Sequence, residues 1–189
     1  MKKIILLLTF CSLLQPVSFA QKAVTGYLEG GLSLHAAWKD GSTGAYLPSF
    51  TLGPGVKFIG KGDVSIILDI PCSAGWNLKK GTYFGIHVPL MLNFQFGSAS
   101  ANKGNSKFGF ILGAGAGYTN IANYYEYSST QRAHKEFWGY HLRAGLSFDR
   151  SDESFSGPML VFNFGKSISP GNGYIAGISL LVGGTIGKN

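Results

Sequence analysis

The segment YFGIHVPLMLNFQFG, residues 83–97, alternates apolar and polar positions along its length. From Phe84 to Phe96 every even-numbered residue is apolar, and the odd-numbered residues between them are polar or small apart from Met91. A period of two residues is typical of a β-strand with one apolar and one polar face. The segment therefore predicts a single amphipathic strand, about twice the usual strand length of globular proteins.

Seven further segments repeat this alternation, and clusters of Gly, Asn, Ser and Lys separate them as turns. The eight predicted strands are 24–38, 50–58, 64–76, 84–96, 108–118, 138–148, 160–168 and 174–186. In all eight, the apolar face falls on even residue numbers. The exceptions are Gly26, Gly30, Pro54, Lys166 and Gly184.

The odd-numbered face is polar but carries little charge. It consists mostly of Gly, Ser, Thr and Asn, and its apolar members are Tyr27, Ala37, Ile67, Met91, Ile111, Val161, Ile175 and Leu181. A soluble sandwich or barrel turns its apolar row inward and covers its outer face with charged residues. Here the sequence favours the inverted arrangement, in which the apolar row faces lipid and small polar side chains fill the interior.

The inverted pattern requires a closed sheet, because lipid cannot satisfy the hydrogen-bonding groups of a sheet edge. A charge on the lipid face costs about 2–4 kcal/mol at the middle of the membrane, which explains why Lys166 is the one charged residue on the even face. We therefore predict an all-β fold, an eight-stranded antiparallel up-and-down transmembrane β-barrel. We expect it to lie in the outer membrane.

Aromatic residues gather at the two ends of the predicted strands, as in the interfacial belts of transmembrane barrels. Trp38, Trp76 and Trp138 lie at one end, and a group of phenylalanines marks the other. The loops 39–49, 77–83, 119–137 and 169–173 at the tryptophan end are expected to face outside. The turns 59–63, 97–107 and 149–159 are expected to face the periplasm.

The N-terminus has two lysines, a short apolar run and the residues Ser18-Phe19-Ala20, which predict a secretory signal peptide over 1–20. Residues 21–189 would then form one barrel domain. Charged residues make up 13% of the chain and Gly accounts for 28 residues, a composition unlike that of an ordinary soluble domain. After the signal no apolar run is long enough for a transmembrane helix.

The segment His87–Gly97 contains Pro-Leu-x-Leu followed by an aromatic residue and Gly, and Gly109–Tyr118 reads GFILGAGAGY. With these motifs the chain resembles the small eight-stranded outer-membrane β-barrel proteins, OmpA-like or porin-family barrels. It is particularly similar to the outer-membrane β-barrel domain found in Bacteroidota. The resemblance implies location and fold, and it implies a lumen plugged by side chains.

Four charged residues occupy odd positions and should point into the barrel. They are Glu29, Lys57, Asp69 and Arg143, with zero net charge. An eight-stranded barrel is just wide enough for side chains to fill it, and unpaired charges there would be costly. We expect a paired network that plugs the lumen, with a rearranging gate as the alternative.

Three histidines, His35, His87 and His141, also occupy odd positions, each three residues from the outer end of its predicted strand. Three imidazoles at one depth are candidate ligands for zinc or copper. Their strands are not neighbours, however, so hydrogen-bonded histidines without a metal are the favoured interpretation. No cofactor is expected.

The favoured function is structural or interaction-related: membrane integrity, adhesion or display of surface loops. The alternatives are a narrow channel for small solutes and a soluble secreted barrel that binds a hydrophobic ligand. A lipid-modifying enzyme is disfavoured, because the sequence has no His-x-Ser motif and no outward pair of Ser and His. Expected partners are outer-membrane lipid, lipopolysaccharide and the outer-membrane assembly machinery. We expect a monomer that binds no nucleic acid.

Two prolines, Pro71 and Pro89, fall inside predicted strands, where each removes a ladder hydrogen bond. We predict a bulge or local irregularity near each of them.

Overall fold

The computed structural model describes residues 24–39, 45–59, 64–77, 83–100, 107–125, 132–148, 155–168 and 173–186. The predicted signal peptide lies outside these residues. Within them the structure contains no helix with the length and apolar character of a membrane span. The strands are β1 (Val24–Lys39), β2 (Ala45–Ile59), β3 (Val64–Asp69), β4 (Cys72–Asn77), β5 (Tyr83–Gly97), β6 (Phe108–Tyr125), β7 (Arg132–Phe148), β8 (Phe155–Ser167) and β9 (Gly173–Ile186).

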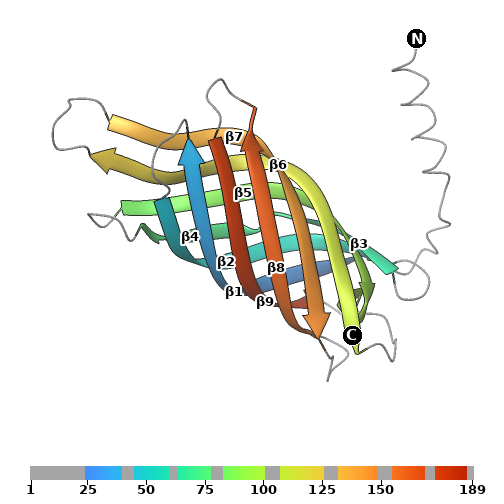
Figure 1. Cartoon of the computed structure of the whole chain (residues 1–189). Coiled ribbons are helices and arrows are strands. Elements are labelled where there is room, and N and C mark those ends of the chain that lie inside the picture. Colours follow the sequence, from blue (N-terminus) through green and yellow to red (C-terminus); the bar gives the residue numbers. More distant parts are fainter. Residues whose placement is uncertain are drawn as a thin grey trace, which may run out of the picture.

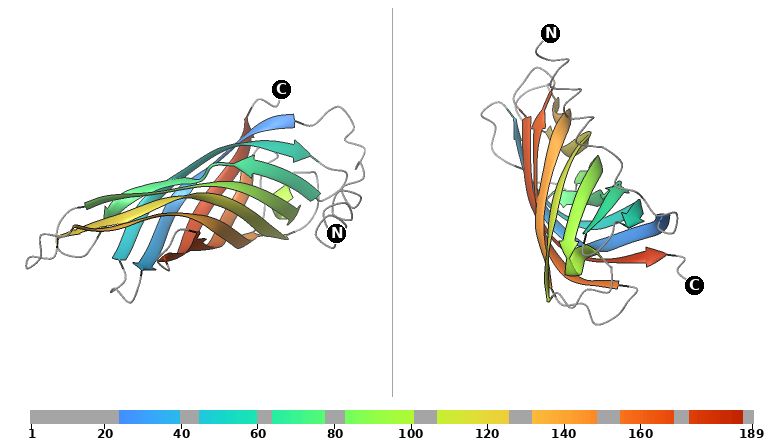
Figure 2. Two further views of the ribbon diagram at one scale, coloured as in Figure 1. Left: turned by 90° about the horizontal axis from the view of Figure 1, so that it is seen from above. Right: turned by 90° about the vertical axis from the view of Figure 1, so that its right-hand side faces the viewer.

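These strands form one closed antiparallel barrel (Figure 1), because β1 pairs with both β2 and β9. The nine segments correspond to eight barrel strands, because β3 and β4 follow each other along the same path between β2 and β5. The predicted eight-stranded up-and-down topology is confirmed. Two further views show the strands tilted around the barrel (Figure 2).

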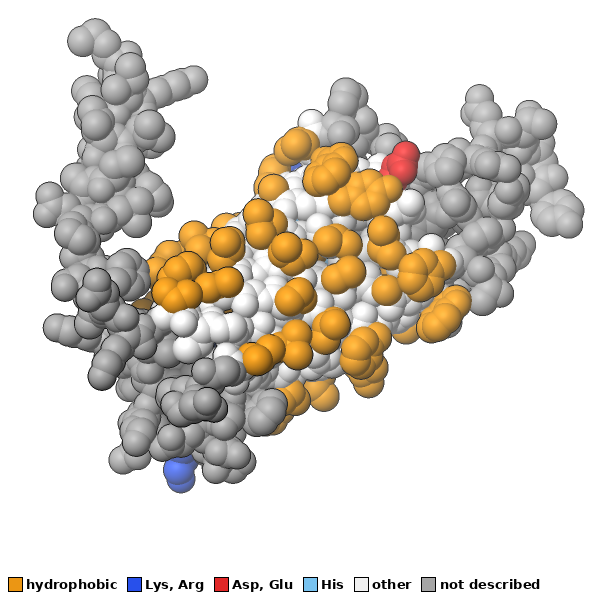
Figure 3. All heavy atoms as spheres, turned by 180° about the vertical axis from the view of Figure 1, so that it is seen from behind, with side chains coloured by type: hydrophobic (Ala, Val, Ile, Leu, Met, Phe, Trp, Pro, Cys, Tyr) orange, Lys and Arg blue, Asp and Glu red, His pale blue; other side chains and the backbone are white. Residues whose placement is uncertain are grey.

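The alternation predicted from the sequence is the alternation of the structure. Even-numbered apolar side chains such as Phe50, Leu90 and Leu180 are exposed on the outside, and odd-numbered side chains are buried inside. Apolar side chains are spread over the outer face of the barrel (Figure 3). Because nearly every exposed position within the strands is apolar, the outer surface is suited to hydrocarbon rather than to water.

Several strands are longer than predicted. β2 begins at Ala45 instead of residue 50, β6 continues to Tyr125, β7 begins at Arg132 and β8 begins at Phe155. Turn-like residues such as Pro48 and Pro158 hid these extensions, although Ala45, Leu47 and Ser49 keep the odd-inward parity at the start of β2. The loops predicted over 39–49 and 119–137 and the turn over 149–159 are correspondingly shorter.

The two irregularities predicted at the prolines coincide, because the pairing of β5 with β3 and β4 is interrupted between Met91 and His87, on either side of Pro89. The gap between β3 and β4 contains Pro71, whereas β5 runs unbroken through Pro89 and keeps its register with β6. The register on both sides of the gap places Pro71 directly opposite Pro89. Ile70 donates its N–H to Pro54 in β2, so odd-numbered residues of this path direct their N–H toward β5. The two absent donors therefore belong to a single rung.

The barrel has two different ends. At the end named here the hairpin end, β6 and β7 stay paired beyond the neighbouring strands, up to Tyr125 and Arg132, and they project from the barrel in Figure 2. At the opposite end, named here the η1 end, a short 3-10 helix, η1 (Ser98–Ser100), follows β5 and is buried. Gly97 makes this turn with a φ of 64°, a conformation that favours glycine.

Candidate functional site

The interior of the barrel is the candidate site, and its centre is the guanidinium of Arg143. Nη2 donates to both carboxylate oxygens of Glu29, at 2.8 and 2.9 Å, and Nη1 donates to Oδ2 of Asp69 at 3.3 Å. Asn93 donates to the other Asp69 oxygen at 2.9 Å. All four side chains are buried. Charge-assisted bonds of this kind hold the strands β7, β1, β3 and β5 together across the lumen.

Lys57 joins this group through neighbours rather than through a bond to Arg143. Its Nζ donates to Oε1 of Gln95 at 3.4 Å and lies 5.8 Å from the centre of the Tyr27 ring. Tyr27 in turn donates to Oε2 of Glu29 at 3.4 Å. The structure thus brings the four predicted charged residues into one connected network, with Tyr27 and Gln95 as members that the charge pattern alone did not single out.

A row of small polar side chains runs along the inner wall between the charged network and the histidines. Ser73, Thr51, Ser33 and Ser179 are joined in sequence by hydroxyl contacts of 2.7, 2.6 and 2.7 Å, and Asn163 donates to Ser179 at 3.3 Å. These five residues come from β4, β2, β1, β9 and β8, which are adjacent in that order. Odd parity identifies each of them in the sequence, but only closure of the barrel brings them into contact.

The three histidines meet, although their strands are not neighbours. The ring centres of His35 and His87 are 5.0 Å apart, and those of His87 and His141 are 4.9 Å apart. Nδ1 of His35 lies 3.3 Å from Oγ of Ser49, and Nδ1 of His87 lies 3.0 Å from Oγ1 of Thr119. Within the described residues, no group of three or more His, Cys, Asp or Glu side chains is placed so that it could hold a metal ion.

Two apolar clusters lie in the lumen, one toward each end. The outer plug, toward the hairpin end, consists of Ala37, Ala45, Leu47, Phe137 and Ile175. The inner plug, toward the η1 end, consists of Ala99, Ile111, Met159, Val161 and Leu181. The odd-numbered apolar residues that interrupted the alternation in the sequence are therefore largely the material of these plugs. The remaining plug residues lie in segments that the sequence analysis predicted as loops or turns.

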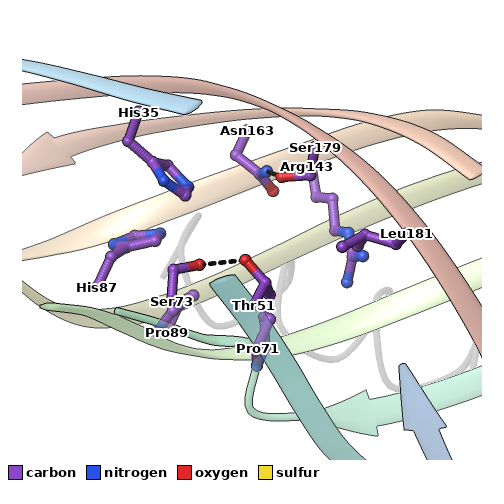
Figure 4. A pocket seen from close by; sticks show the side chains of 10 residues that line it. All are labelled: His35, Thr51, Pro71, Ser73, His87, Pro89, Arg143, Asn163, Ser179 and Leu181. Carbon is purple, nitrogen blue, oxygen red and sulfur yellow. Dashed lines mark hydrogen bonds between the residues drawn. The ribbon is translucent and has the colours of Figure 1, made fainter. Parts of the chain in front are cut away.

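Little space is left between the plugs. A cavity of about 10 Å³ lies between the histidines and Arg143, lined by His35, His87, Thr51, Ser73 and Asn163 among others (Figure 4). This volume is on the scale of a single water molecule. The described side chains in this part of the lumen are closely packed.

The predicted belt tryptophans lie on the outside near the hairpin end. Trp38, Trp76 and Trp138 are exposed. Their rings contact Tyr174, Phe84 and Tyr118, respectively. Aromatic rings in this position suit the boundary between hydrocarbon and water.

Fold and inverted surface together define the class: this is an eight-stranded antiparallel barrel of the outer-membrane type. No protein-family model and no curated protein matches the chain. Solved structures match the fold. Neisserial surface protein A aligns with a TM-score of 0.58 at 11% identity, over 87% of this chain and 100% of that chain. Ail of Yersinia pestis, in complex with the heparin analogue sucrose octasulfate, aligns with a TM-score of 0.51 at 13% identity, over 86% and 98%.

Proposed function

We propose that this chain is an outer-membrane protein with a structural or interaction role, whose lumen does not conduct. The observation that carries the proposal is the filled interior. Arg143, Glu29 and Asp69 bridge the lumen at mid-depth, and an apolar plug lies on either side of the polar layers. A solute would have to displace both plugs and break a buried ion network, whose disruption costs several kcal/mol.

The projecting hairpin supports the interaction role. β6 and β7 remain paired past the ends of β5 and β8, so a two-stranded ribbon carries the chain beyond the barrel rim. At its base Tyr118 donates to Glu136 at 3.0 Å and accepts a hydrogen bond from Asn120 at 3.2 Å. A braced ribbon of this kind extends beyond the membrane surface, where a partner reaches it. Lipopolysaccharide is the proposed neighbour at this end.

For the enzymatic alternative, the lumen contains suitable histidine and hydroxyl side chains, but a substrate has no access to them. His35 and His87 each lie beside a hydroxyl, of Ser49 and Thr119, as a base lies beside a nucleophile. All four side chains are buried in the lumen beneath the outer plug, where a lipid or peptide substrate does not fit. The proposal is therefore a non-enzymatic protein.

Conductance across planar bilayers tests the closed lumen. Wild-type protein is expected to give no steady open-channel steps, and a variant combining Arg143→Ala with Phe137→Ala and Ile111→Ala is expected to give them, because it opens the network and both plugs. Steady steps from the wild type would refute the proposal and favour the narrow channel.

Cell fractionation tests the location. The protein is expected in the outer-membrane fraction, extracted only with detergent and shifting in electrophoretic mobility when boiled. Recovery in the soluble periplasm without detergent would refute the membrane location. It would favour the secreted barrel that binds a hydrophobic ligand.

A further inference from the structure

The lipid-facing row of β7 contains one small residue. From Trp138 to Phe148 the outward-facing residues are large, and Ala144 alone is smaller than leucine. The residues that pair with Ala144 on the neighbouring strands are Leu112 and Phe162, which are 55% and 50% exposed. A methyl group between two large side chains leaves a hollow in the outer wall of the barrel.

This hollow is a groove of about 270 Å³ over β6, β7 and β8, which run side by side (Figure 1). The residues around it are all apolar: Phe110, Leu112, Ala144, Leu146 and Phe162, with Ile111 and Gly145 beneath them. The volume is several times the roughly 30 Å³ that one water molecule occupies in the liquid. A length of hydrocarbon chain therefore fits the groove in both size and polarity.

The lipid-facing row of β8 carries one charge, at Lys166, four residues from Phe162. Its Nζ lies 5.6 Å from the centre of the Tyr174 ring, and its partner on β7 is Tyr140. Among the described residues no carboxylate forms an ion pair with Lys166. Glu136, on β7 nearer the hairpin tip, accepts a hydrogen bond from a tyrosine of β6 instead. The ammonium group is therefore available to an anion at the membrane interface.

The spacing between this charge and the groove fits one leaflet of a membrane. Four residues of a β-strand span about 13 Å, and the tilt of the strand makes the difference in depth smaller. A hydrocarbon core of about 30 Å gives each leaflet about 15 Å. A lipid whose headgroup contacts Lys166 therefore reaches the groove with one of its own acyl chains.

The groove and the charge have different roles. Lipid tails are as apolar as leucine, so the groove by itself gives little preference for one lipid over another. It does determine where a chain lies, because a chain that fills it makes dispersion contacts that an empty hollow lacks. Selectivity comes from the ammonium group, which pairs with phosphate, and from the two tyrosine hydroxyls beside it, which are hydrogen-bond donors for headgroup oxygens.

We propose that the outer wall of β6, β7 and β8 binds one lipopolysaccharide molecule through its lipid A, with a phosphate on Lys166 and an acyl chain in the groove over Ala144. Lys166 lies toward the hairpin end, which is expected to face outside, and the bound lipid therefore belongs to the outer leaflet. The site rests on the membrane location in the proposed function and adds to it the residues that hold the lipid.

Retention of lipid A by the full chain tests the site. The protein is refolded in a mild detergent and mixed with bisphosphorylated lipid A, and bound lipid is counted by native mass spectrometry. One lipid A per chain is expected. Lys166→Gln is expected to weaken binding about fivefold, the usual contribution of one cation near an anionic membrane surface. Ala144→Leu fills the groove and is expected to give a loss of similar size.

Two matched variants control for charge and for volume. Lys107→Gln removes an exposed cation next to β6 at the η1 end, and Ala74→Leu enlarges an outward-facing alanine on β4. Both should bind lipid A like wild type. Loss of binding in either control, or unchanged binding in both Lys166→Gln and Ala144→Leu, would overturn the proposal.

Other ligands separate the two contacts. Dephosphorylated lipid A should bind equally to wild type and Lys166→Gln, and inorganic phosphate should not displace lipid A. Phosphatidylglycerol that binds as tightly as lipid A would overturn the choice of lipid, and a dimer that Ala144→Leu disrupts would assign the groove to a second copy of the chain. A wild-type chain that requires detergent but retains no lipid A overturns this site alone, whereas a chain soluble without detergent overturns the membrane location.

Discussion

Several glycines in the lumen lie opposite bulky polar side chains. Gly165 pairs with His141, Gly177 with His35 and Gly113 with Asn93. A Cβ at any of these glycines would overlap the side chain across from it. In so narrow a barrel a bulky side chain is more easily accommodated where the adjacent strand has none. This explains part of the glycine content that the composition left unexplained.

The His141–Gly165 pair gives a prediction at the residue scale. Gly165→Ala should destabilise the barrel by about 1–3 kcal/mol, because its Cβ would lie against the imidazole ring. The same change in a His141→Ala background should cost much less. Urea unfolding of the four proteins in lipid vesicles measures the coupling. Gly30→Ala is the control, since its Cβ would meet only ordinary contacts of 3.6 Å or more. Additive effects would contradict the packing argument.

Arg143 gives a second prediction at this scale. Arg143→Ala leaves Glu29 and Asp69 buried without their common partner and should cost about 3–5 kcal/mol of unfolding free energy. Neutralising Lys57 as well should destabilise the barrel further. Lys107→Ala removes an exposed charge and should change stability by less than about 0.5 kcal/mol. Equal stability of Arg143→Ala and wild type would show that the network is not structural.

At the scale of the elements, two prolines that lie opposite each other interrupt one barrel strand, but the barrel stays closed. Pro71 and Pro89 lie opposite each other, so their absent N–H groups are concentrated in a single rung. The ladder to β6 is preserved, and Ile70 still donates to Pro54 in β2. Two prolines in unrelated positions would each have removed a rung elsewhere. The arrangement shows how a sheet without edges tolerates proline.

Pro71→Ala tests this arrangement. The new N–H at position 71 should donate to the carbonyl of Pro89 and join β3 to β4 as one continuous strand. Its amide should therefore exchange slowly with solvent deuterium in detergent, at a rate similar to those of its neighbours. Pro48→Ala, in β2 away from this rung, is the comparison. Rapid exchange at position 71 would mean that the gap has another cause.

At the scale of the whole molecule, the outer surface determines where the barrel is stable. Leu90, at the middle of β5, is 50% exposed, and Ile168, just after β8, is 70% exposed. Both side chains point outward, but they differ in position along the barrel. In water an exposed leucine is an ordinary surface residue, whereas in a membrane its depth decides what it costs to replace.

A pair of arginine substitutions measures this depth. In lipid vesicles Leu90→Arg should cost about 2–4 kcal/mol of unfolding free energy, and Ile168→Arg about 0–1 kcal/mol. The natural Lys166 lies near the same end as Ile168, with its Nζ 5.6 Å from the centre of the Tyr174 ring, where a long side chain reaches the interface. Equal costs at the two positions would contradict a transmembrane orientation.

The alternation of side chains determined much of this protein by itself. A strict period of two fixes which residues face the same way, so the inward placement of Arg143, Glu29 and the histidines follows from parity. The near absence of charge on the even face also indicated that the outer surface contacts lipid and not water. Strand ends were predicted less well, because Leu47, Phe137 and Met159 lie among turn-like residues.

Tertiary structure alone decided which inward side chains meet. Closure and stagger bring together residues far apart in the sequence, such as His35 and His87 or Arg143 and Glu29. The odd-numbered apolar residues are exceptions to the alternation in the sequence, but in the closed barrel most of them lie in the two plugs. Parity is a local property of a strand, whereas depth and neighbours in the lumen depend on the tilt and register of all the strands together.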